Sequence, residues 1–133
     1  MARVQARLDA LSARYPEMAQ PDYDRLAALW HELRSGGGTA DENETFRRII
    51  HDFKGQGGSV GYPLISDIAA LLGELIRCAD LASELARQAV DQHVAAIRAV
   101  LHNRMAGDGG ALGRTLKSDL QALAAKRLGA PLS

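Results

Sequence analysis

The chain has little of what disulfide scaffolds, β-sheets and membrane proteins require. It contains one cysteine, which excludes an intramolecular disulfide and fits a reducing compartment. Its aromatic residues are three Tyr, two Phe and one Trp, too few for the strands of a typical sheet. No segment approaches about 18 uninterrupted apolar residues, and the first residues lack the apolar run of a signal peptide. We therefore expect a cytoplasmic protein that does not enter a membrane.

The sequence also lacks an excess of either charge. Its 16 basic and 16 acidic residues cancel, so no global field recruits nucleic acid or an anionic membrane. It contains no His-Glu-x-x-His, no paired cysteines and no phosphate-cradling Gly-x-x-x-x-Gly-Lys. His93 and His102 would lie on opposite sides of one helix, so they cannot jointly bind a metal. We expect no nucleic-acid partner, no cofactor and no metal, and the partner should be another protein.

The residues that are present are typical of a helical protein. Apolar residues make up 47% of the 133 positions, mostly Leu and Ala, which is enough for one real core. They recur at spacings of three and four in one segment after another. We expect a single all-α domain over residues 1–133, with an antiparallel four-helix bundle (up-down-up-down) over residues 22–104. An N-terminal accessory helix within residues 1–15 and a C-terminal accessory helix over residues 110–128 would flank it.

Prolines divide the first part of the chain. Residues 3–14 should form a short amphipathic helix that ends before Pro16. Pro16 and Pro21 should then bracket a connection. The next helix should run from residue 22 or 24 to about residue 34, with Trp30 as the largest apolar anchor of the core.

Glycines and a capping residue mark the following boundary. The Ser-Gly-Gly-Gly run at residues 35–38 should end the preceding helix, in which His31 would lie at the edge of the buried face. Thr39 or Asp41 can cap the next helix. Acidic residues in its first turn are favourably placed against the helix dipole.

The second half should contain three more helices. Residues 63–79 form the most apolar segment, which we expect to be packed on more than one side and to bury Cys78. A short connection should lead to an antiparallel partner over residues 81–104, on which His93 and His102 would be surface or boundary residues.

A last apolar stripe follows the glycine-rich break at residues 107–110. It contains Leu112, Leu116, Leu120 and Leu123. Such a stripe must be buried, either against the bundle or against a partner. Of these two alternatives we favour folding back onto the bundle.

The segment that stands out runs from Phe46 to Gly61. On a helical wheel, at about 100° per residue, one apolar stripe contains Phe46, Ile49, Ile50, Phe53, Gly57 and Val60. His51 lies about 150° from the middle of this stripe and should therefore point to solvent. Around it should lie Arg47, Lys54, Gly55 and Gly58.

Four glycines crowd residues 55–61. Each glycine inside a helix costs about 1 kcal/mol relative to alanine, so a compensating use is expected. Gly55 and Gly58 would clear the surface on the face of His51, where another macromolecule could bring its backbone close. Gly57 and Gly61 would lie on or near the buried side, where a neighbouring helix could approach. The alternative is that the helix stops at Lys54 and the glycines form an ordinary loop.

This segment contains the motif His51-x-x-Lys54-Gly55-x-x-Gly58-x-x-Gly61, followed by an apolar helix. The motif resembles the signature of histidine-containing phosphotransfer (HPt) domains, and the resemblance covers roughly residues 40–100. That family commonly has a small residue after Lys-Gly, whereas this chain has Gln56, which would point away from the histidine and affect packing more than chemistry. The resemblance implies a four-helix bundle whose exposed histidine relays a phosphoryl group between receiver-domain aspartates, or from a hybrid histidine kinase to a response regulator.

The resemblance also implies roles for particular residues. His51 would be phosphorylated, and Lys54, one turn on, would stabilise the phosphoryl group, with Arg47 and Arg48 as weaker candidates. A receiver domain would dock on Gly55, Gly58, Gly61, Arg47 and Arg48. Magnesium would come with the receiver, because no carboxylate set here is arranged to hold it. The chain would act as a monomer, without kinase activity of its own, between a hybrid histidine kinase and response regulator receiver domains.

Three other interpretations stay open. The chain could be a helical adaptor that uses no phosphate, which transfer from a phosphorylated receiver would test. It could be the dimerisation helix pair of a histidine kinase, which would be an obligate dimer. His51 could also be a solvated surface histidine without a role.

Overall fold

The described part of the chain is entirely helical. The computed structural model describes residues 2–127; Met1 and residues 128–133, which include the last residue of the expected helix 110–128, lie outside it. Its elements are α1 (Ala2–Arg34), α2 (Ala40–Gln56), the short 3₁₀ helix η1 (Gly57–Val60), α3 (Pro63–Cys78), α4 (Glu84–His102) and α5 (Gly110–Arg127). No strand occurs among residues 2–127, and the predicted all-α class is confirmed. None of the helices described combines the length and the apolar character that crossing a membrane requires.

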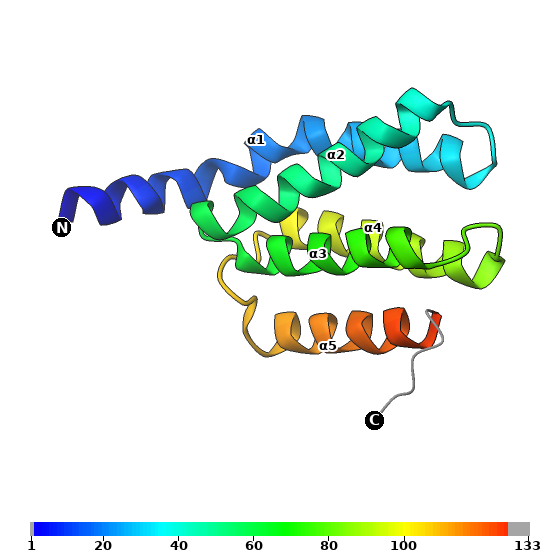
Figure 1. Ribbon diagram of the computed structural model, residues 1–133. Helices are drawn as coiled ribbons and strands as arrows, with labels where there is room; N and C mark the ends of the chain where they lie inside the picture. Colours follow the sequence, from blue (N-terminus) through cyan, green and yellow to red (C-terminus); the bar gives the residue numbers. More distant parts are fainter. Residues whose placement is uncertain (1, 128–133) are drawn as a thin grey trace.

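Helices α1 to α4 contact one another in a closed ring, in which α1 also touches α4. Helix α5 packs outside this ring against α3 and α4 (Figure 1). Its Leu120 is buried, although Leu112 at its start is 70% exposed. The Lys117 ammonium lies 3.0 Å from the Asp67 carboxylate of α3. The prediction that the last apolar stripe folds back onto the protein is therefore confirmed.

Helix α1 is continuous, so the predicted break between Pro16 and Pro21 is wrong. A proline inside a helix removes one backbone hydrogen bond and destabilises it by about 3 kcal/mol, which other interactions must offset. Burial across the prolines provides such interactions, because Tyr15, Pro16 and Ala19 are all buried. The Tyr15 ring packs against that of Tyr62, with ring centroids 5.3 Å apart. Tertiary contacts therefore stabilise the helix across a segment that the two prolines would otherwise interrupt.

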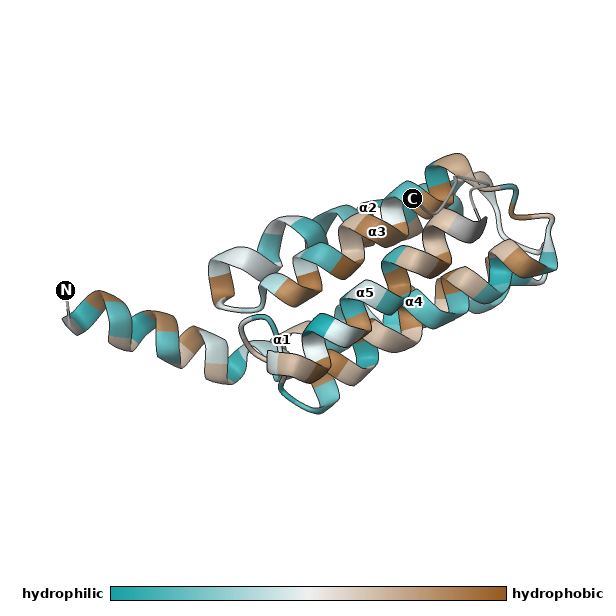
Figure 2. Cartoon of the chain, turned by 90° about the horizontal axis from the view of Figure 1, so that it is seen from below, coloured by the Kyte–Doolittle hydropathy of each residue, from teal (hydrophilic) through white to brown (hydrophobic). Residues whose placement is uncertain are grey.

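The start of α1 extends beyond the other helices (Figure 1, Figure 2). Arg104 holds the base of this extension: it donates a hydrogen bond to the Ala13 carbonyl and forms an ion pair with Glu17. Further out, three apolar side chains are exposed: Val4, Leu8 and Leu11. The helix expected within residues 1–15 exists as the first part of α1 and not as a separate element.

Helix α2 begins where local sequence signals predict, but it ends at Gln56, before the expected end at residues 61–63. The Thr39 hydroxyl accepts from the Glu42 N–H, and the Glu42 carboxylate accepts from the Thr39 N–H, both at 3.1 Å, which forms a capping box. The predicted apolar face is confirmed by the burial of Phe46, Ile49, Ile50 and Phe53. Gly55 is still part of α2, whereas Gly57 and Gly58 belong to the tighter 3₁₀ helix η1 that follows, so neither the continued α-helix nor the ordinary loop is found. Gly61 ends this turn with a φ of 84°, a left-handed value that favours glycine.

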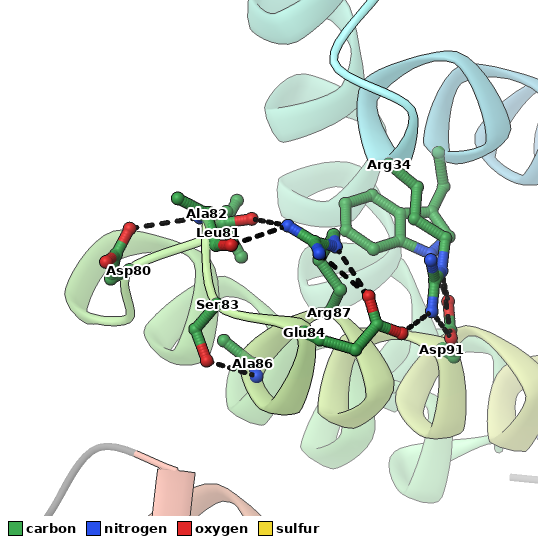
Figure 3. Close-up of polar contacts among 10 residues, drawn as sticks. Arg34, Asp80, Leu81, Ala82, Ser83, Glu84, Ala86, Arg87 and Asp91 are labelled. Atoms are coloured by element: carbon green, nitrogen blue, oxygen red, sulfur yellow. Dashed lines mark hydrogen bonds and ion pairs between the residues drawn. The ribbon is translucent and has the colours of Figure 1, made fainter.

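A polar cluster joins the end of α1 to the start of α4 (Figure 3). The Trp30 indole donates to Asp91 at 2.7 Å, and the Arg34 guanidinium donates to both Asp91 carboxylate oxygens at 2.9–3.0 Å. Arg34 also donates to Glu84 at 2.7 Å, and Arg87 holds Glu84 from the other side at 2.8 Å. Burial raises the pKa of Asp91, but the hydrogen bonds from Arg34 and Trp30 outweigh it and place this pKa below its usual range. Trp30 is a core residue, as predicted, and its indole N–H is satisfied by this cluster.

Replacing Asp91 should destabilise the protein, because it removes the acceptor of a buried indole. We expect Asp91→Ala to lower the free energy of unfolding by about 1–3 kcal/mol. Asp91→Asn should cost less, because its amide oxygen can still accept from Trp30. Chemical denaturation of the two variants and the wild type measures both effects. Equal stability of all three proteins would show that the cluster contributes nothing.

Two side chains lie opposite to their predicted environments. His93, expected at the surface, is fully buried, because α4 is covered by α1, α3 and α5 on several sides. Its Nδ1 donates to the Ala89 carbonyl at 2.7 Å, while its buried Nε2 has no hydrogen-bond partner in the described residues. Cys78, expected in the core, is exposed at the end of α3. His31 is exposed and not at the boundary, whereas His102 lies at the surface as predicted.

Burial of His93 should make the protein less stable in mild acid. Burial lowers the pKa of His93 below its ordinary 6.5, and the hydrogen bond to Ala89 opposes this only in part. The unfolded chain therefore takes up a proton before the folded protein does, and stability falls as the pH drops below about 6.5, by at most about 1.4 kcal/mol per pH unit. His93→Leu should lack this component. Unfolding measured from pH 7.5 to pH 5 tests it, and parallel curves for the two proteins would contradict it.

Candidate functional site

His51 is exposed on α2, at the edge of a shallow groove between α2 and α3. The groove has a volume of about 260 Å³. Helix α3 leaves this space open because it presents small residues toward α2, namely Ala69, Ala70 and Gly73. The apolar floor comes from Ile50 and Ile76, which are buried. A ligand in this groove would therefore contact His51 from the side of α3.

Four charged side chains line the groove beside His51. Arg47 and Lys54 come from α2, one turn before and one turn after the histidine. Glu74 and Arg77 come from α3. The Arg47 Nε donates to the Asn43 side chain at 3.2 Å, which directs the guanidinium along α2. The lining thus contains three cations and one carboxylate.

Glu74 and Arg77 form an ion pair along one flank of α3. The Arg77 guanidinium lies 2.5 Å from Glu74 Oε2, and the Cys78 thiol lies 3.5 Å from Glu74 Oε1. Hydrogen bonds from Arg77 and Cys78, with the positive charges of Arg77 and Lys54, hold the pKa of Glu74 below its usual range. Both side chains of the pair are more than half exposed, so they can change partners without unpacking the core.

The glycines near His51 differ in their surroundings. A Cβ atom added at Gly55 would meet no neighbouring atom within 4 Å, and one at Gly58 would approach only the Ser66 hydroxyl, at 3.9 Å. The Gly58 N–H donates to that hydroxyl at 2.9 Å, which fixes the turn. Gly61 instead faces α1, because a Cβ there would lie 3.1 Å from the Ser12 hydroxyl. Open surface therefore exists at Gly55, one turn after the histidine on α2, and at Gly58 in η1.

The structure brings together only part of the predicted site. His51, Lys54 and Arg47 share the groove. Arg48 does not line it, and its guanidinium lies 3.9 Å from Glu44 one turn back on α2. Sequence reasoning missed Glu74 and Arg77, although their spacing of three marks one flank of a helix. Only the packing of α3 beside α2 brings that flank to His51.

The terminal segments leave this groove uncovered in the described structure. All its lining residues belong to α2 and α3. Helix α5 packs on α3 and α4 and makes no contact with α2 over the residues described. The extension of α1 continues past the end of α2 and contributes no residue to the lining. Within residues 2–127, the groove beside His51 is therefore open to another macromolecule.

The arrangement combines a nucleophile with positive charge. A neutral imidazole can attack an electrophilic centre through a ring nitrogen without a separate base. Nearby ammonium and guanidinium groups stabilise negative charge that develops on the electrophile. Among residues 2–127, His, Cys, Asp and Glu form no group of three or more able to hold a metal ion.

Comparison with protein-family models, with curated proteins and with solved structures found no match for this chain.

Proposed function

We propose that this protein is a phosphorelay intermediate that accepts a phosphoryl group on His51 from a receiver-domain aspartate and passes it to a response regulator. The observation that carries the proposal is the exposed imidazole of His51 in a cationic groove, with open surface at Gly55 one turn along α2 and at Gly58 in η1. Phosphoryl transfer requires mainly positioning and positive charge near the transferred oxygens. Lys54 supplies that charge from the turn that follows His51.

The transfer is a simple exchange of bonds. A ring nitrogen of His51 attacks the phosphorus of the aspartyl phosphate. The new N–P bond forms as the P–O bond breaks, and the released electron pair stays on the aspartate carboxylate. The other ring nitrogen keeps its proton. The reverse exchange on a second receiver restores the imidazole, and the receiver contributes the magnesium ion.

The proposal includes the finer architecture that such a domain would have. Helices α1 to α4 would form an up-down-up-down bundle, with α5 as an accessory helix. The closed ring of contacts among these four helices supports this arrangement. So does the alternation of chain direction along successive helices (Figure 1). Residue 22, the expected start of the bundle, lies inside α1 and is not the start of a helix, because α1 is continuous.

Transfer from phosphorylated receiver domains tests the function. Purified receivers are labelled with radioactive phosphate on aspartate, freed of their kinase and mixed with the protein. We expect the label to move to the protein from some receivers and to be stable to base and labile to acid, as a phosphohistidine is. Absence of transfer from every receiver in a broad set would instead favour the adaptor. Light scattering adds the second test, because the kinase dimerisation domain would be a dimer and this protein should be a monomer.

Gly58→Glu should weaken receiver docking without unfolding the protein. An added Cβ at Gly58 would meet only the Ser66 hydroxyl, at an ordinary contact distance of 3.9 Å, and Gly58 is exposed, so the fold should tolerate the substitution. Its bulk and charge would meet the incoming receiver, and we expect affinity to fall at least about tenfold. Gln88→Glu, at an exposed position on α4, is the control and should bind normally. Unchanged affinity of Gly58→Glu, measured by calorimetry, would place docking elsewhere.

A further inference from the structure

We infer that Arg77 of α3 is a second phosphoryl-binding cation of this site, and that Glu74 holds its guanidinium until the phosphoryl group on His51 displaces the carboxylate. This inference rests on the proposed function of His51. It assigns a role to two residues outside the motif on α2. It also predicts that α3 changes its side-chain pairing when the protein is phosphorylated.

The position of Arg77 supports the inference first. Arg77 lines the same groove as His51 and Lys54, but from the opposite wall. A phosphoryl group on a ring nitrogen extends into the space beside the imidazole. With Lys54 on one wall and Arg77 on the other, its oxygens could be contacted from both helices. Lys54 alone would reach them only from α2.

The balance of charge in the groove supports it next. Arg47, Lys54 and Arg77 contribute three positive charges and Glu74 one negative charge, so the lining carries 3 − 1 = 2 net positive charges. A phosphoryl group brings roughly −1.5 to −2 charges near neutral pH. The groove therefore matches a dianion in addition to the carboxylate that it already contains.

The ion pair between Glu74 and Arg77 is the contact that the phosphoryl group would replace. Arg77 lies 2.5 Å from Glu74, yet the two side chains are 66% and 52% exposed. Exposed ion pairs contribute little net stability, so exchange of the partner is inexpensive. A guanidinium binds phosphate oxygens through two parallel hydrogen bonds, which a dianion strengthens. Arg77 should therefore leave Glu74 for the phosphoryl group, whereas in the unphosphorylated protein Glu74 keeps it in place.

The ionisation of the phosphoryl group itself is the most direct readout. Phosphoramidate phosphorylates exposed histidines and releases ammonia, so no receiver is needed. Phosphorus NMR then follows the N–P signal of His51, identified by its loss in His51→Gln, from pH 6 to pH 9. A nearby cation favours the dianion and lowers the pKa of the phosphoryl group. We expect Arg77→Ala to raise this pKa by roughly half a pH unit, Arg77→Lys to restore part of the shift, and Glu74→Gln to lower the pKa.

A double variant tests whether Glu74 acts through Arg77. If it does, the effect of Glu74→Gln should shrink when Arg77 is already alanine. Arg98→Ala, on an exposed part of α4, is the matched control and should leave the titration unchanged. Equal titration curves for the wild type, Arg77→Ala and Arg98→Ala would overturn the inference and leave the proposed function intact. Failure of the wild type to accept phosphate on His51, from phosphoramidate and from receivers alike, would overturn both.

Discussion

His51→Gln should abolish phosphoryl acceptance and leave the fold unchanged. Glutamine is close to histidine in size and polarity, but its amide has no nucleophilic ring nitrogen. His51 is exposed and makes no part of the core, so the substitution should alter the free energy of unfolding by less than about 0.5 kcal/mol. The transfer rate from a phosphorylated receiver should fall below detection, because the other exposed histidines, His31 and His102, lie outside the groove.

A variant of a second exposed histidine shows whether the loss of phosphoryl acceptance is specific to His51. His102 is also exposed, at the end of α4, outside the groove. His102→Gln should accept phosphate at the rate of the wild type. Receiver transfer assays on both variants, with circular dichroism to verify the fold, measure the difference. Full transfer to His51→Gln, or equal loss in the two variants, would remove His51 from its proposed role.

Gly57→Ala should produce the largest loss of stability among the glycine variants near His51. Gly57 is buried where α2 meets α3, and an added Cβ would lie 2.6 Å from the Tyr62 carbonyl oxygen and 2.8 Å from the Ser66 nitrogen. These are backbone atoms, which cannot move unless α3 shifts away from α2. We expect a loss of about 1–3 kcal/mol in the free energy of unfolding.

Gly55→Ala, the same substitution two residues before Gly57, is the control. Gly55 lies inside α2, and an added Cβ would meet no atom within 4 Å. Alanine is the better helix former, so this variant should gain up to about 1 kcal/mol. Urea denaturation should therefore separate the two variants by about 1–4 kcal/mol. Two variants of equal stability would mean that the close approach at Gly57 is not required.

Local signals made the helix of His51 predictable. A capping box depends on residues three apart, and an apolar stripe depends on helical periodicity, so both are present in the sequence alone. The exposure of His51 follows from the same periodicity, because it lies opposite residues such as Phe46 and Phe53. The left-handed turn at Gly61 and the start of α3 at Pro63 are likewise local.

The errors in prediction arise where distant contacts outweigh local preference. Proline disfavours the interior of a helix, yet α1 continues through Pro16 because its neighbours are buried against the rest of the protein. His93 is polar and is predicted at the surface or at its boundary, but it is fully buried on α4, a helix that three other helices contact. Cys78 is apolar enough for a core, but it is exposed at the end of α3, although Leu75 and Ile76 in the same turn are buried. Such burial depends on which helices become neighbours.

The sequence alone was sufficient to predict an all-α protein with a histidine facing solvent, because helical periodicity and caps act over a few residues. Only the packing of α3 against α2 brings Glu74 and Arg77 to that histidine, since they are more than 20 residues away along the chain. The groove, its balance of charge and the continuity of α1 were likewise decided by the tertiary structure, in which side chains far apart in sequence exclude water together.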